Sequence, residues 1–106
     1  MVWFTMSNGE QPLFDDGYEA HYEAALHADT TGKPVALFDV YNEKAPYCVI
    51  SPGERRKHAE AYAKYLRDGA DDYERDARRA LSIRDWMLQT ATELRAKADA
   101  IMPVSA

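Results

Sequence analysis

A long segment without glycine or proline constrains the fold of this chain most. It runs from Asp72 to Met102, "DYERDARRALSIRDWMLQTATELRAKADAIM", and Pro103 follows it. Because glycine and proline are the residues that most strongly interrupt helices, the sequence predicts one continuous helix, about 46 Å long at 1.5 Å per residue. A compact domain of 106 residues has a diameter on the order of 35 Å. Such a helix would extend beyond its own domain.

The apolar residues of this segment predict contacts on more than one side. Steps of four and three residues join a stripe in which only Arg84 is polar, and we expect Arg84 to pair with an acidic group or to lie at a symmetric contact. Ile83, Trp86, Leu81 and Leu88 widen the apolar arc to roughly 200°, whereas an ordinary surface helix has a stripe of about 100°. We therefore expect self-association through this helix. The predicted interface consists of Tyr73, Ala80, Ile83, Arg84, Trp86, Met87, Ala91, Leu94, Ala98 and Ile101.

The first half of the chain predicts a helix followed by a β-hairpin. "YEAHYEAALHA" has helical spacing, and Gly32 and Pro34 end it. Its expected apolar face consists of Tyr18, Tyr22, Ala25 and Leu26. The runs "VALFDVY" (35–41) and "YCVI" (47–50) flank a turn and predict two antiparallel strands. We expect Phe38 and Val40 on the core side of this hairpin and Asp39 on the wetter side, and "VWFTM" is a candidate third strand. The rest of residues 1–17 is expected to be irregular.

"SPGE" is the clearest local signal for the start of a helix. Ser51 fits the N-cap, Pro52 the first helical position and Glu54 the far end of a capping box. This helix is expected to run to about Arg67, and Gly69 is expected to end it or to kink it. The predicted fold is one small α+β domain: an N-terminal helix, a β-hairpin, and two antiparallel helices of which the C-terminal one is long.

Composition and charge exclude several classes of protein. The hydrophobic content of 46% favours an ordered domain. The net charge is −5, and residues 1–50 hold eight acidic and two basic groups, so nucleic acid is not expected as a partner. The single cysteine, Cys48, excludes an intramolecular disulfide and favours a reducing cytoplasm. No apolar run has the length of a membrane span, the start has no signal-peptide pattern, and Met6 is an alternative start.

Few residues suggest chemistry. Arg55 and Arg56 occupy the first turn of a predicted helix, where they form either a candidate anion site or, as we favour, a solvated face. His58, Tyr62 and Tyr65 share a face and form a candidate ligand pocket. Glu19, Glu23 and His27 also share a face, but they lack the spacing and the number of ligands of a metal site. We expect no catalytic residues, no metal and no cofactor.

The sequence favours an interaction protein over an enzyme. Seven tyrosines, many of them on predicted helix faces, are typical of surfaces that are partly covered by a partner. We expect a small, non-enzymatic regulatory module that binds itself and an unidentified protein. One alternative is an acidic inhibitor that imitates nucleic acid and acts against a host protein, as mobile elements encode. Another is a small-ligand binder or enzyme that uses His58, Tyr62 and Tyr65.

Overall fold

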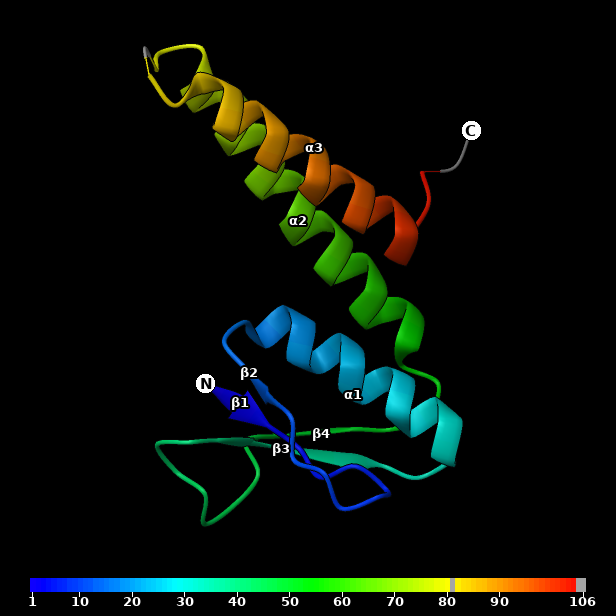
Figure 1. Ribbon diagram of the computed structural model, residues 1–106. Coiled ribbons are helices and arrows are strands. Elements are labelled where there is room, and N and C mark those ends of the chain that lie inside the picture. The colour runs from blue at the N-terminus through cyan, green and yellow to red at the C-terminus, as the bar shows by residue number, and fades with distance from the viewer. Residues whose placement is uncertain (81, 105–106) are drawn as a thin grey trace. The chain divides into compact units, whose positions relative to one another are not determined.

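The computed structural model describes residues 1–80 and 82–104 and shows an α+β protein (Figure 1). The described residues form three helices and a four-stranded antiparallel sheet. The chain divides into two compact units, Met1–His58 and Ala59–Ala106. The first contains the sheet and one helix, and the second contains most of a helical hairpin.

The sheet has the order β2-β1-β3-β4, and every neighbouring pair is antiparallel. Its strands are β1 (Val2–Trp3), β2 (Leu13–Phe14), β3 (Val35–Asp39) and β4 (Cys48–Ile50). The predicted hairpin is confirmed as β3 and β4, and the N-terminal segment does supply a further strand. Two short strands, β1 and β2, therefore precede the first helix. The predicted order of elements began with a helix and gave "VWFTM" only as a candidate strand.

Helix α1 (Gly17–Thr31) packs on one face of the sheet through alanines. The Asp16 side chain caps its start by accepting a hydrogen bond of 2.8 Å from the Tyr18 amide. Gly32 ends it in the left-handed region, with φ at 73°. The expected apolar face of Tyr18, Tyr22, Ala25 and Leu26 is confirmed at Ala25 and wrong at Tyr18, which is half exposed. The fully buried positions are alanines. These are Ala20, Ala24, Ala25 and Ala28.

The core-facing side of β3 is the opposite of the predicted one. Val35 and Leu37 of β3 are buried in the core beneath α1, together with Phe4 and Ile50. Alternation along the strand then places Phe38 on the opposite face, where its ring stacks on that of Trp3 at 4.6 Å. The expectation that Phe38 faces the core is therefore wrong, and its apolar ring finds a cross-strand aromatic partner instead.

The predicted continuous helix over 72–102 is wrong, because the chain turns back within that segment. Helix α2 (Arg55–Ala77) and helix α3 (Arg84–Ile101) are separate. The end of α2 tightens, since the Arg78 and Arg79 amides bond to carbonyls three residues earlier. Absence of glycine and proline permits a long helix but does not require one. Folding back buries alanines of both helices, as Ala70, Ala77, Ala91 and Ala98 show. Leu81 lies outside the described residues.

Helix α2 begins later and ends later than predicted. Gly53 has φ at 95°, which no helical residue adopts, and its amide bonds to the Asp29 carboxylate at 2.8 Å. The helix therefore starts after Glu54, whose carbonyl accepts from the His58 amide. Half of the expected capping box is present, because the Ser51 amide donates to the Glu54 carboxylate. Gly69 lies inside the helix rather than at its end.

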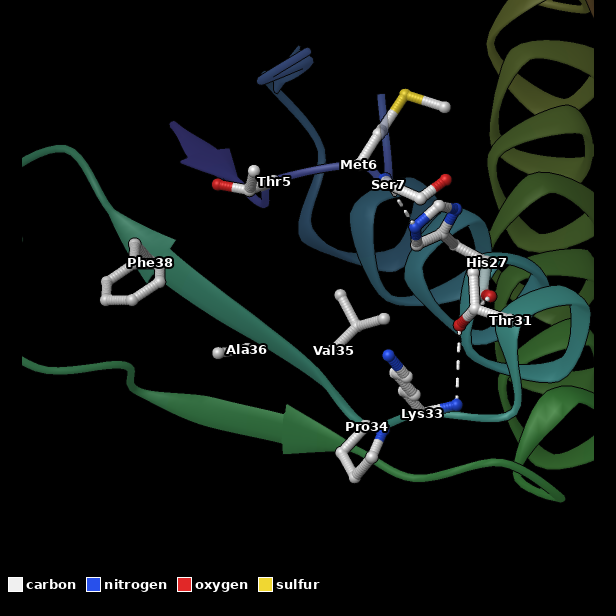
Figure 2. Close-up of a pocket in the computed structure, with 10 residues that line it drawn as sticks. All are labelled: Thr5, Met6, Ser7, His27, Thr31, Lys33, Pro34, Val35, Ala36 and Phe38. Carbon is white, nitrogen blue, oxygen red and sulfur yellow. Dashed lines mark hydrogen bonds between the residues drawn. The ribbon is translucent and has the colours of Figure 1, made fainter. Parts of the chain in front are cut away.

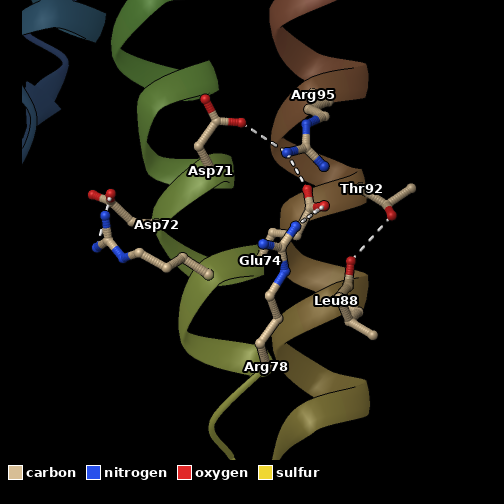
Figure 3. Close-up of polar contacts among 8 residues, drawn as sticks. Asp71, Asp72, Glu74, Arg78, Leu88, Thr92 and Arg95 are labelled. Carbon is tan, nitrogen blue, oxygen red and sulfur yellow. Dashed lines mark hydrogen bonds and ion pairs between the residues drawn. The ribbon is translucent and has the colours of Figure 1, made fainter.

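The antiparallel pairing of the last two helices is confirmed, with α2 ending at Ala77 and α3 beginning at Arg84. Arg95 bonds Asp71 at 2.8 Å and also bonds Glu74 (Figure 3). Arg67 bonds Asp99 at 2.8 Å. Partners early in α2 lie late in α3, which fixes the antiparallel register. The expectation that the C-terminal helix is the long one is wrong, since α2 has 23 residues and α3 has 18.

We expect Gly69→Ala to stabilise the protein by about 0.5–1 kcal/mol. A Cβ at residue 69 would lie 3.6 Å from Leu94 Cδ1, an ordinary contact, and alanine restricts the unfolded chain more than glycine does. Urea unfolding followed by circular dichroism measures the change. Gly32→Ala is the matched control. A Cβ at residue 32 would meet no other atom within 4 Å, but φ there is positive. We therefore expect this variant to lose about 1 kcal/mol of stability. Destabilisation by Gly69→Ala would contradict the packing described for the hairpin.

Candidate functional site

A cavity of about 460 Å³ opens between β3 and the chain that follows β1 (Figure 2). Figure 2 shows His27, Thr31 and Lys33 on one side of it and Ala36 and Phe38 on the other. Thr5, Met6 and Ser7 border it from the chain after β1. All of these residues belong to the first unit. The volume is in the range of small-molecule sites, which spans roughly 300–1,000 Å³.

The cavity exists because β1 leaves the sheet early. Pairing between β1 and β3 reaches Trp3 and Phe38 and goes no further. The next residues turn toward α1, where the Ser7 amide donates a hydrogen bond of 3.1 Å to His27 Nε2. Continued pairing would have placed Thr5 opposite Ala36. The space between these two segments is the cavity.

Polar groups on the helix side of the cavity are ordered by local hydrogen bonds. The Thr31 hydroxyl donates to the His27 carbonyl at 3.0 Å and accepts from the Lys33 amide at 3.3 Å. The His27 Nε2 atom accepts the Ser7 amide hydrogen bond, so Nδ1 is the ring nitrogen left for other contacts. Among the described lining residues there is one ammonium group, that of Lys33, and no carboxylate. The cavity therefore presents the positive charge of Lys33 with no carboxylate to oppose it among its described lining residues.

A second polar cluster joins His21, Tyr47 and His58. His21 Nε2 and the Tyr47 hydroxyl share a hydrogen bond of 2.7 Å. The rings of His21 and His58 meet edge to face with centroids 5.4 Å apart. Within the described chain, His58 Nε2 is buried without a hydrogen-bond partner. A buried unsatisfied nitrogen costs free energy, about 1–3 kcal/mol in typical cases.

Burial and like charge both keep this histidine pair neutral. The pKa of His21 is lowered from 6.5 by burial first, and then by the neighbouring charges of His58 and Lys57. Burial also lowers the pKa of His58, against an opposing effect of Glu54. The pKa of Tyr47 is raised, mainly by burial, so its hydroxyl stays protonated. Neutral imidazoles and a protonated phenol make a cluster that resists acquiring charge.

The candidate ligand residues from the sequence lie in different environments. Arg55 and Arg56 are exposed in the first turn of α2, and the neighbouring Lys57 pairs with Glu54 at 3.9 Å. His58 is partly buried beside His21. Tyr62 is buried and lies under the ammonium of Lys97, 5.5 Å from its ring centroid. Tyr65 is half exposed.

The predicted interface residues also divide by burial. Ala91 and Ala98 are buried, so they lie inside the chain's own hairpin. Ile83, Arg84 and Trp86 are exposed. The remaining members are partly buried: Tyr73, Ala80, Met87, Leu94 and Ile101.

Sequence reasoning missed the residues that the fold brings together. His21 and Tyr47 are 26 positions apart, and Ser7 and His27 are 20 apart. No local spacing signals such pairs. His27 was noted only as a neighbour of Glu19 and Glu23 on one helical face. Within residues 1–80 and 82–104, no three His, Cys, Asp or Glu side chains are grouped to hold a metal ion.

Comparisons with protein-family models, curated proteins and solved structures find no match for this chain. Residue roles are therefore inferred from its own geometry. In the part of the chain that the structure describes, none of the helices has both the length and the apolar character needed to cross a membrane.

We expect the protein to lose stability as the pH falls from about 7.5 to about 5. The unfolded histidines take up protons near 6.5, whereas folded His21 and His58 resist protonation to lower pH. Acid therefore favours the unfolded state until the pH falls below the folded pKa values. Urea unfolding at a series of pH values measures this slope.

Substitutions separate the histidine pair from other titrating groups. We expect His21→Gln and His58→Gln each to make the slope shallower. His27→Gln is the control, since His27 bonds Ser7 and not Tyr47. Equal slopes in all three variants and the unsubstituted protein would show that the pair does not govern acid sensitivity.

Proposed function

We propose that this protein is a non-enzymatic interaction module that self-associates through one side of its α2–α3 hairpin. The long protruding helix that first suggested self-association does not exist. The proposal rests instead on one observation, which is that the two sides of the hairpin differ in character. One side is held by ion pairs, and the other exposes large apolar side chains.

The ion-paired side follows from contacts between the helices. Arg95 reaches Asp71 and Glu74, and Arg67 reaches both Asp99 and the Met102 carbonyl. These charges already have partners within the chain. Each such exposed pair contributes little to stability, but together they fix the register of α2 against α3.

The opposite side, here called the aromatic side, consists of Tyr65, Tyr73, Ile83, Trp86, Leu94 and Ile101. Helical spacing places the three α3 members on one stripe with the N-cap residue Ile83, since they follow it by 3, 11 and 18 positions. Trp86 meets Tyr73 edge to face at 5.7 Å, so the two helices form a joint surface. Trp86 remains 56% exposed and Ile83 50% exposed. Exposed aromatic and aliphatic groups on one surface favour a protein partner.

A second copy of the chain suits this side. Helix α3 is about 27 Å long and two adjacent helices are about 20 Å wide. Two copies would then bury roughly 1,000 Å² in total, near the lower limit of a specific interface. Two hairpins joined about a two-fold axis form a four-helix arrangement, which buries the outer apolar stripes that one hairpin leaves exposed.

We expect Ile83→Glu combined with Trp86→Glu to convert a dimer to a monomer. Two carboxylates per copy would be desolvated at the contact, and loss of a central tryptophan weakens an interface by about 30-fold or more. Sedimentation equilibrium at micromolar concentration measures the change. Circular dichroism checks that the helices persist, as the exposure of both side chains leads us to expect.

Val49→Glu is the matched control for apolar exposure. Val49 is 53% exposed on β4, in the other unit of the chain. We expect this variant to remain dimeric. A monomeric unsubstituted protein, or dissociation by Val49→Glu and not by the hairpin variant, would refute self-association through the aromatic side.

A further inference from the structure

We propose that the cavity between β1 and β3 binds a small carboxylate that carries a short apolar arm. This site lies wholly within the first unit and does not depend on self-association. Three features of the cavity select such a ligand: its charge, its exposed backbone groups and its apolar wall.

The charge of the cavity selects a monoanion. Lys33 is one of only two basic residues among the first fifty, which otherwise have eight acidic groups. No carboxylate is found among the described residues that line the cavity. One ammonium balances one negative charge. The second negative charge of a phosphate dianion would have no cation to balance it, in a half of the chain that is already acidic. A carboxylate is therefore the matched anion.

The cavity lies at the C-terminal end of α1, where the helix dipole opposes an anion. That end is equivalent to about half a negative charge, which the full positive charge of Lys33 exceeds. One carbonyl of the last turn is satisfied locally, since the Gly32 amide donates to the Ala28 carbonyl. In the turn before it, the Thr30 hydroxyl donates to the Leu26 carbonyl and the Thr31 hydroxyl to the His27 carbonyl. These bonds reduce the negative potential that an entering carboxylate would meet.

The backbone of β3 adds a donor and an acceptor. The Leu37 carbonyl accepts from the Tyr47 amide, so Leu37 directs its polar groups toward β4. Successive residues of a strand alternate in this direction, which directs the amide and carbonyl of Ala36 toward β1. Pairing with β1 has already ended at Trp3. Ala36 therefore offers hydrogen bonds to an extended ligand, as an exposed strand edge does.

The apolar wall and the volume limit the size of the ligand. Met6, Pro34 and Val35 line the cavity together with the Phe38 ring. A space of about 460 Å³ admits a ligand the size of one or two amino acids. A free N-acyl amino acid and the C-terminal residue of a peptide share this chemistry, with a carboxylate, an amide bond and an apolar side chain.

The test uses N-acetyl-leucine as the probe and amide chemical shifts of the full-length protein as the readout. We expect shifts of the Ser7, Thr31, Lys33 and Ala36 amides that saturate at millimolar concentration. N-acetyl-leucinamide, which lacks the carboxylate, is expected to bind about tenfold more weakly or not at all. Inorganic phosphate, tested in parallel, is expected to bind more weakly than the carboxylate.

Lys33→Gln and Lys44→Gln form a matched pair of variants. Both lysines are exposed members of the first unit, but only Lys33 lines the cavity. We expect Lys33→Gln to weaken N-acetyl-leucine binding about tenfold and Lys44→Gln to leave it unchanged. An unchanged denaturation profile checks that each variant folds.

A tetrapeptide ending in leucine separates the two sources of carboxylate. Tighter binding of the peptide than of N-acetyl-leucine, with larger shifts at Ala36, would identify a peptide C-terminus as the ligand. Equal binding would identify a free acid. The proposal is overturned if neither acid shifts these amides, if the amide derivative binds as well as the acid, if phosphate binds more tightly, or if the two lysine variants behave alike.

Discussion

The packing of alanines against a neighbouring backbone is the constraint on which the rest of the structure depends. In the first unit, the fully buried face of α1 is made of alanines, which bring the helix close to the sheet. Two hydrogen bonds of that unit depend on the short distance between helix and sheet. The same helix brings His21 to Tyr47, in the segment before β4, and His27 to Ser7, in the segment after β1. A wider helix face would separate these pairs beyond hydrogen-bonding distance.

Alanine in the interior also explains the excess of tyrosine on the surface. Of the seven tyrosines, Tyr62 is buried, whereas Tyr18, Tyr41, Tyr47 and Tyr65 are exposed. Close approach of helix and sheet leaves interior volume for few rings, among them that of Phe4. Large side chains are then placed at the margins of each packed layer, where one end of the ring is dry and the hydroxyl is wet. The aromatic side of the hairpin and the exposed rings of the first unit share this origin.

The sequence predicted elements whose signals are local and failed where tertiary packing decides. The helix that became α1 and the strands β3 and β4 were identified from spacing and turn residues, and Gly32 ends α1 as predicted. The turn within 72–102 was missed because nothing local forbids a continuous helix there. The segment between α2 and α3 has a helix propensity that would favour a continuous helix. That propensity is outweighed by the burial of alanines when the helices pair, namely Ala70, Ala77, Ala91 and Ala98. In the same way, Gly69 did not end α2, since packing against Leu94 supports it.

The candidate sites were less predictable than the fold, because they form where regular structure stops. The cavity results from a strand that leaves its sheet after Trp3, and its walls come from segments separated by up to about thirty positions. Hydrophobic periodicity gives the position of strands but not the residue at which pairing ends. What the sequence does contain is the cause of the departure: His27 on α1 provides an acceptor for the Ser7 amide. A backbone donor needs a partner wherever it is withdrawn from water, and here a helix side chain replaces the next strand pair. When the chain after Trp3 turns toward His27, the backbone amide and carbonyl of Ala36 lose their partner on β1. The proposed ligand site and the hydrogen bond from Ser7 to His27 therefore have the same cause.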